Sequence, residues 1–438
     1  MSNVDRIMTA PAGPERLLMV SSDGHASAQM EEYRDYLPTA WHQEFDEFCK
    51  VYKQKGSRNF ETQALLQRFD TAVVDVWQEN VMKPRRYRGL FEPTSRFEEM
   101  NRHGVAAEVL FPDFGLPFEL YSPLLAAEHG YRRTPAQKKV ANQAYNRWLV
   151  DFCSQAPERF AALALVNFEV VEEALDEIAW AKSVGIRGVI MPMFTEEHPV
   201  FHPRFDPIWS LLQELEMPIN SHISLSGIKV YEPKIPPFPH PAVATPVFGR
   251  VMGFYCQQIL SHLIWGGVLE RFPNLQVVFT EQGSGWVVGE LQSMDYSWEG
   301  SFFRRDVREI VRHTPSFYFR RQCHLGSSLF SKAEAEARYQ IGIDKITVGM
   351  DFPHLEGTWG VGPGHIEYLR ATLGAAGVLP DEARLMVGEN ALRLWGFDRV
   401  ALQPVVANIG PTIADLLSPP ERDDFPLGDV HKPLSMTF

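Results

Sequence analysis

The chain has 438 residues, of which 45% are hydrophobic, and a formal net charge of −13 at pH 7. This length fits two average domains or one large α/β barrel, and the acidic charge argues against nucleic acid or an anionic membrane as a partner. The four cysteines are scattered without C-x-x-C spacing, so the sequence indicates neither a zinc ribbon nor a disulfide framework. No signal peptide and no long apolar run stands out, so we expect a cytoplasmic protein without a membrane span.

Short apolar runs recur along the chain and predict β-strands that are buried on both faces. In chain order they are residues 17–22, 104–112, 159–166, 185–192, 217–222, 275–281, 316–324 and 345–351. Stretches with helical periodicity separate most of them, for example residues 135–157 and 170–185. An eightfold alternation of strand and helix is typical of an α/β fold of the (β/α)8 TIM-barrel type. A doubly wound open sheet is the competing fold, but no G-x-G-x-x-G follows the first run.

The spacing of the runs predicts long insertions after the first and fifth strands. We expect a barrel over residues 1–400, insertions at about 26–100 and 223–265, and a C-terminal tail over 401–438. Both insertions follow the C-terminal end of a strand, so they should lie over the face that carries active sites in barrels. Such insertions roof a pocket or form a subunit contact, and we expect a homodimer.

Acidic and histidine side chains stand where four of the predicted strands end. They are Asp23, His25, His222, Glu281 and Asp351. Taken singly, Asp23 could be a helix cap, His25 a surface histidine, His222 a core histidine and Asp351 a turn or cap residue. The C-terminal ends of parallel strands meet on one face of a barrel, and carboxylates and imidazoles are the ligands of hydrolytic divalent metals. Their shared position therefore predicts a metal site.

Several stretches resemble the amidohydrolase superfamily, in its amidohydrolase-related (amidohydrolase 2) branch of metal-dependent hydrolases and aromatic-acid decarboxylases. These stretches include SSDGH, GVAAEVLFP, GIRGVIMP, GGVLERFPNLQVVFTEQGSGWV and GMDFPHLEGTW, and they occur in the family's order. The resemblance implies a divalent metal held by an acid/histidine pair after strand one, a histidine after strand five and an aspartate after strand eight. These roles fall on Asp23 and His25, on His222 and on Asp351.

Two departures from the family pattern concern the metal. The common H-x-H motif is replaced by Asp23-x-His25, and Glu281 stands where many members place a histidine. An anionic ligand at Glu281 would favour a second cation, which His324 is positioned to help bind, so one or two ions per chain remain open. Mixed carboxylate and imidazole ligands suit zinc, manganese or iron, and we take zinc as the default.

The predicted mechanism centres on a metal-activated water. We expect Asp351 to accept its proton and return it to the leaving group. His324 and His354 are candidates for stabilising the oxyanion or protonating the leaving group, and Arg321 for anchoring an anionic group of the substrate.

The sequence favours a hydrolase of a small-molecule substrate, cleaving an ester, thioester, amide or vinylogous C–C bond of a bulky carboxylated or acyl compound. The alternative is a non-oxidative, metal-dependent decarboxylase of an aromatic or unsaturated acid. Glu281 occupies a position where family decarboxylases use a histidine, and the large insertions suit a bulky substrate. Both features favour hydrolysis. A binding protein on a decayed barrel is disfavoured by the full ligand set.

Overall fold

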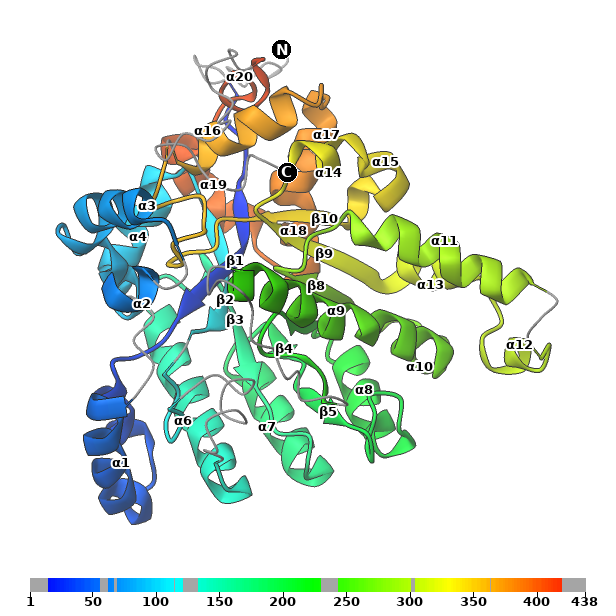
Figure 1. The fold of residues 1–438 in the computed structure, drawn as a ribbon, viewed down its shortest axis with the longest axis horizontal. Coiled ribbons are helices and arrows are strands. Elements are labelled where there is room, and N and C mark those ends of the chain that lie inside the picture. Colours follow the sequence, from blue (N-terminus) through cyan, green and yellow to red (C-terminus); the bar gives the residue numbers. More distant parts are fainter. Residues whose placement is uncertain are drawn as a thin grey trace, which may run out of the picture.

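Eight parallel strands with helices around them form a nearly closed barrel (Figure 1). The structure is a computed structural model that describes residues 15–55, 62–66, 69–113, 115–120, 133–229, 243–300, 304–362 and 364–419. The barrel strands are β1 (Val20–Ala26), β2 (Ala107–Pro112), β3 (Phe160–Leu165), β4 (Gly188–Ile190), β6 (Ile219–His222), β8 (Val277–Thr280), β9 (Cys323–Ser328) and β10 (Ile346–Gly349). Each pairs with its neighbour in this order, which confirms the predicted (β/α)8 barrel.

The gap between the first and last strands is bridged by backbone hydrogen bonds just beyond the end of β10. The backbone N–H of Asp351 donates to the carbonyl of Asp23 at 3.0 Å, and that of His25 donates to the carbonyl of Phe352 at 2.6 Å. These two hydrogen bonds join β1 to the segment after β10. They bring together two segments in which metal ligands are predicted.

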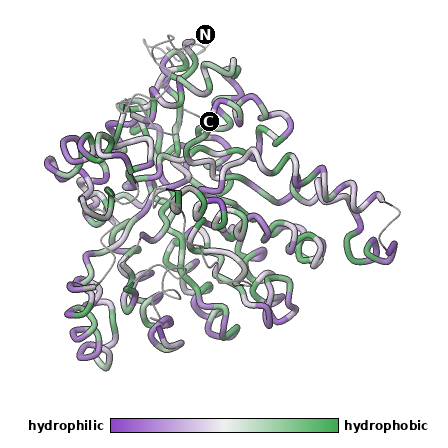
Figure 2. The backbone as a smooth tube through the Cα atoms, in the orientation of Figure 1, coloured by the Kyte–Doolittle hydropathy of each residue, from purple (hydrophilic) through white to green (hydrophobic). Residues whose placement is uncertain are grey.

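Helices cover the outside of the strands. They are α1 (His42–Lys55), α2 (Thr62–Leu66), α3 (Thr71–Trp77), α4 (Pro93–Arg102), α6 (Pro135–Cys153), α7 (Val171–Ser183), α8 (Asp206–Glu214), α9 (Ala244–Trp265), α10 (Val268–Arg271), α11 (Trp286–Glu299), α12 (Val307–Ile310), α13 (Pro315–Gln322), α14 (Lys332–Glu336), α15 (Arg338–Ile341), α16 (His365–Leu369), α17 (Pro380–Arg384), α18 (Asn390–Leu394), α19 (Arg399–Ile409) and α20 (Ile413–Leu417). Hydrophilic and hydrophobic residues alternate along the outer helices (Figure 2), as expected where one face packs on a sheet. Among the described residues, no helix is long and apolar enough to cross a membrane.

The predicted strand over residues 316–324 is wrong. Pro315 opens a helix, α13, and the true strand β9 begins only at Cys323. The aromatic run misleads because Tyr318 and Phe319 are buried while Phe317 is exposed, which is the one-sided burial of a helix turn. The strand therefore ends at Ser328 and not at residue 324.

The first insertion is largely helical, with α1 to α4 between β1 and β2. The second contains α9 and the short strand β7 (Gly227–Lys229), which pairs with β5 (Met193–Thr195) outside the barrel. Residues 230–242, which include its proline-rich stretch, lie outside the described residues. The predicted barrel–tail boundary at residue 401 falls inside α19, and the Leu17 N–H donates to the Pro411 carbonyl at 2.7 Å. The tail up to residue 417 is therefore helical and joined to the start of β1.

Candidate metal centre

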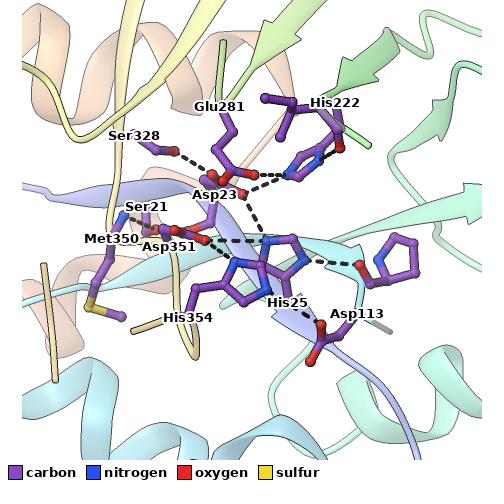
Figure 3. Close-up of polar contacts among 12 residues, drawn as sticks. Ser21, Asp23, His25, Asp113, His222, Glu281, Ser328, Met350, Asp351 and His354 are labelled. Carbon is purple, nitrogen blue, oxygen red and sulfur yellow. Dashed lines mark hydrogen bonds and ion pairs between the residues drawn. The ribbon is translucent and has the colours of Figure 1, made fainter. Parts of the chain in front are cut away.

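The structure brings all five predicted metal-ligand side chains together at the C-terminal ends of the barrel strands (Figure 3). Their ligand atoms form two overlapping groups, and within each group all atoms lie within 4.8 Å of one another. The first group is Asp23, His25, His222 and Glu281, and the second is His25, Glu281, Asp351 and His354.

The distances between these atoms fit ligands that share one ion. His25 Nε2 lies 3.6 Å from Asp23 Oδ1 and 3.4 Å from Asp351 Oδ1. His222 Nε2 lies 3.4 Å from Asp23 Oδ1 and 3.2 Å from Glu281 Oε2. Ligands at 2.0–2.2 Å from an ion are separated from one another by roughly 3.0–3.5 Å in tetrahedral or octahedral geometry. Three of the four distances are thus longer than a normal hydrogen bond, and all four suit coordination.

Both imidazoles are oriented by the backbone. His25 Nδ1 lies 2.9 Å from the carbonyl of Pro112, and His222 Nδ1 lies 2.7 Å from that of Ile223. A carbonyl only accepts, so Nδ1 carries the proton in each ring and Nε2 offers its lone pair to the cluster. Within the described residues, buried His25 Nε2 and Asp351 Oδ2 have no hydrogen-bond partner. Buried polar atoms of this kind require a partner, and a divalent cation supplies one.

Asp23 is aimed at the cluster by a residue absent from the predictions. Ser328, at the end of β9, donates a hydrogen bond to Asp23 Oδ2, which leaves Oδ1 facing the two histidines. Ser328 escaped prediction because the strand that carries it was placed too early in the chain. With the strand end in its true place, a polar residue there would have marked a candidate.

Glu281 and Asp351 share an unusual backbone conformation. Both have φ of 56°, in the left-handed region that non-glycine residues rarely adopt. Glu281 directly follows β8, and its backbone N–H donates to the Gly326 carbonyl at 3.0 Å. Asp351 lies two residues after the end of β10, and its backbone N–H donates to the Asp23 carbonyl at 3.0 Å. Such strain persists where surrounding structure holds it, often at functional sites.

The predicted residue His354 lies beside the cluster, between two carboxylates. Its Nδ1 is 2.8 Å from Asp351 Oδ1, and its Nε2 is 3.4 Å from Asp113 Oδ1. Asp113 is buried, and it too was missed. The signal for it existed, since Asp113 directly follows the predicted strand 104–112 in the same way as the other candidates follow theirs.

Burial and neighbouring charges set the protonation of these groups. Burial opposes a charge on His354, but Asp351 and Asp113 outweigh it and hold the pKa of His354 well above its usual value. Burial likewise disfavours ionised Asp351, yet the positive charge and the hydrogen bond of His354 lower the pKa of Asp351 below its usual value. Burial, together with repulsion from Asp351 and Asp23, raises the pKa of Glu281 well above its usual value. Three carboxylates this close need positive charge to ionise together.

The prediction that His324 acts at the site is wrong. It stands at the start of β9, paired with Val278 of β8, and its Nε2 lies 3.0 Å from Gln276 Oε1. Gln276 precedes β8, whereas Glu281 follows it, so His324 lies at the opposite end of the barrel. There it lines a cavity with Gln276 and Lys345. Burial lowers the pKa of His324 to about 3, so the ring is neutral.

The prediction that Arg321 anchors the substrate is also wrong. Arg321 lies on α13, and its guanidinium donates to the Leu269 carbonyl and the Gln322 side chain. The predicted role required Arg321 to lie on a strand with its side chain inside the barrel, and Arg321 lies instead on a helix outside the barrel.

Comparison with known proteins gives consistent matches over most of the chain. A model of the family described as amidohydrolase matches residues 38–397. The gamma-resorcylate decarboxylase of Rhizobium sp. (strain MTP-10005) is 21% identical over 294 residues, covering 64% of this chain and 80% of that enzyme.

Solved structures share the fold at low identity. An amidohydrolase from Mycobacterium avium subsp. paratuberculosis K-10 has a TM-score of 0.61 at 18% identity, covering 87% of this chain and 99% of its own. A dihydroxybenzoic acid decarboxylase from Polaromonas sp. JS666 was solved with bound manganese and the inhibitor 2-nitroresorcinol. It has a TM-score of 0.52 at 14% identity, and the match covers 87% of this chain and 98% of that enzyme.

Proposed function

The chain belongs to the amidohydrolase family, and we propose that it is a metal-dependent decarboxylase that removes the carboxyl group of an aromatic or unsaturated acid without oxidation. The observation that carries the proposal is a cluster of metal-ligand residues bordered by two side chains able to carry a proton, Glu281 and His354. The choice of decarboxylation over the hydrolysis favoured above is supported by the decarboxylases among the similar proteins.

The residues that would hold the ion are Asp23, His25, His222 and Asp351, with Glu281 beside them. His25 belongs to both ligand groups, and its Nδ1 is already used by the Pro112 carbonyl. A single Nε2 lone pair binds a single ion, so the two groups describe one centre, and we propose one ion per chain. Zinc stays the default, and the manganese in a similar decarboxylase makes manganese the first alternative.

A bound divalent cation supplies positive charge that stabilises the anionic oxygens of a carboxylated substrate. Replacing the carboxyl group by hydrogen then needs one proton at the ring or vinyl carbon. His354 holds a proton at Nε2, turned away from Asp351 and 3.4 Å from Asp113 Oδ1, and it is only partly shielded, with a side chain 15% exposed. Glu281 is similarly accessible, at 16%. These two groups are the candidates for the proton donor.

Hydrolysis remains the second candidate because of Glu281. The family resemblance implies a histidine at this position in decarboxylases, and a carboxylate beside a metal suits a general base for water. The two reactions differ in which solvent atom enters the product. Decarboxylation puts a solvent hydrogen on carbon and releases CO2, whereas hydrolysis puts a solvent oxygen into the product.

Isotope labelling tests the proposal. Protein loaded with Mn²⁺ or Zn²⁺ is incubated in D2O with gamma-resorcylate and a panel of carboxylated phenols and unsaturated acids, and in H2¹⁸O with esters and thioesters. We expect CO2 release matched by a product that carries one deuteron at the carbon that lost the carboxyl group. Incorporation of ¹⁸O into a product acid, with no CO2 from any of the acids, would instead establish the hydrolase.

A further inference from the structure

One buried arginine touches both segments that carry metal ligands. Arg96, on α4 in the first insertion, is fully buried. Its Nη1 donates to the backbone carbonyl of His25 at 2.8 Å, and its guanidinium carbon lies 4.1 Å from the centre of the Phe352 ring. His25 is a ligand candidate, and Phe352 directly follows another, Asp351. Arg96 therefore contacts the metal-binding parts of β1 and of the segment after β10 at once.

The orientation of this guanidinium is fixed by a second buried residue. Glu108 on β2 accepts a hydrogen bond from Arg96 Nε at 2.7 Å, and both side chains are fully buried. Burying an ion pair is costly, and apolar residues of similar size are often as stable. The buried Arg96–Glu108 pair is therefore better explained by the directed hydrogen bonds that it makes than by a gain in stability. With Nε held by Glu108, the plane of the fork directs Nη1 at the His25 carbonyl.

The backbone of β1 lies directly against this pair. A Cβ atom on Gly24 would come within 2.1 Å of Glu108 Oε1 and 2.6 Å of Arg96 Nη2. Gly24 separates Asp23 from His25, and the pairing of β1 with β2 shifts register between Ser21 and Gly24. The absence of a side chain at residue 24 thus lets the ion pair reach the strand where it carries two ligand candidates.

We propose that Arg96 is a positioning residue that sets the separation of His25 and Asp351, and through it the affinity of the centre for a divalent cation. The inference rests on the metal centre of the proposed function. The backbone N–H of His25 donates to the Phe352 carbonyl at 2.6 Å. Arg96 contacts the residues on both sides of this hydrogen bond, through the carbonyl of His25 and the ring of Phe352. The first insertion thereby acts on the metal centre itself.

A conservative replacement with a matched control tests this role. Arg96→Lys keeps the positive charge beside Glu108 but loses the fork that reaches the His25 carbonyl. Arg159 offers the control, because it is also buried, donates to the Ala106 carbonyl at 2.9 Å and stacks 5.1 Å from the Phe97 ring. It precedes β3, at the end of the barrel away from the metal centre. Arg159→Lys should therefore disturb the fold without disturbing the ligands.

The measurement is calorimetric titration of the metal-free proteins with Mn²⁺ and Zn²⁺, with melting temperatures recorded in parallel. We expect Arg96→Lys to raise both dissociation constants by roughly 10–100-fold, the usual effect of losing a residue that orients a ligand. Arg159→Lys should lower the melting temperature but leave the dissociation constants at the parent's values. Equal dissociation constants in both variants and the parent would overturn the inference.

A second pair of variants covers the case in which Arg96→Lys does not fold. Phe352→Leu removes the ring beneath Arg96, and Phe97→Leu removes the corresponding ring beside Arg159. Only Phe352→Leu should weaken metal binding, and equal affinities in this pair would also overturn the inference. A parent protein that binds neither ion would instead contradict the metal centre of the proposed function, so the two failures are distinguishable.

Discussion

The His354 Nδ1 atom lies 2.8 Å from Asp351 Oδ1. A predicted metal ligand and a predicted acid–base group thus share one hydrogen bond. Because Nδ1 is committed to Asp351, any proton that His354 exchanges with substrate must pass through Nε2, near Asp113. The proposed proton donor therefore meets the proposed metal ligands at this hydrogen bond and at the contact between the His354 and His25 rings, whose centroids lie 4.2 Å apart.

His354→Asn should separate metal binding from turnover. The asparagine amide can still donate to Asp351 Oδ1, so we expect the parent's metal content, measured by elemental analysis. The variant lacks a group that titrates, so kcat should fall by roughly 10²–10⁴, the usual contribution of a positioned acid or base.

The control for this variant is His324→Asn, at the other end of the barrel. It should retain the parent's kcat with the same substrate. A His354→Asn enzyme as fast as the His324→Asn enzyme would show that His354 is no proton donor and would leave Glu281 as the candidate.

Ser328→Ala should weaken metal binding. Loss of the hydrogen bond to Asp23 Oδ2 frees the carboxylate to turn away from His25 and His222. Replacing such a supporting residue costs about 10–100-fold in metal affinity, which titration of the metal-free protein measures. Ser327→Ala is the matched control, because buried Ser327 Oγ has no hydrogen-bond partner in the described part of the chain. If the two alanine variants bind metal equally well, Ser328 does not orient Asp23.

One rule accounts for the site residues that could be predicted from the sequence. Polar residues at strand ends converge in a parallel barrel, and this rule located Asp23, His25, His222, Glu281 and Asp351 without any contact information. The same rule would have included Asp113 had it been applied to every strand. What the rule requires is the correct end of each strand.

The failures arise where local pattern and tertiary packing disagree. The segment over α13 is aromatic enough for a strand, but its proline start and one-sided burial make it a helix. That single error placed His324 and Arg321 at the site and hid Ser328. Left-handed backbone at Glu281 and the contact of Arg96 with the His25 carbonyl depend on packing between distant segments. Neither has a local sequence signal.

Acid should destabilise the fold through two buried histidines. Burial lowers the pKa of His103 and of His365 to about 3. The backbone nitrogen of His365 lies 3.4 Å from His103 Nδ1, which must be unprotonated to accept this hydrogen bond. In the unfolded chain both titrate near 6.5. The folded pKa is lower, so their contribution is complete above pH 6.5 and is lost as the pH falls toward 3. The free energy of unfolding should drop by about 1.4 kcal/mol per pH unit for each histidine.

Urea unfolding of the parent and of His365→Gln between pH 7 and pH 4 measures this dependence. The variant should be less stable at pH 7, because His365 Nδ1 lies 2.7 Å from Thr358 Oγ1 and the replacement disturbs that hydrogen bond. Its stability should depend less steeply on pH, by about 1.4 kcal/mol per unit. Parallel pH profiles for the two proteins would mean that the pKa of His365 is the same in the folded and the unfolded chain.

Metal content per chain tests the central claim most directly. We expect the parent, reconstituted with Zn²⁺ or Mn²⁺ and freed of excess ion, to retain one ion per chain by mass spectrometry. His222→Ala deletes an Nε2 atom that lies 3.4 Å from Asp23 Oδ1 and 3.2 Å from Glu281 Oε2, and should lose that ion. A parent that retains no ion, or a His222→Ala protein that retains a full equivalent, would contradict the metal centre described here.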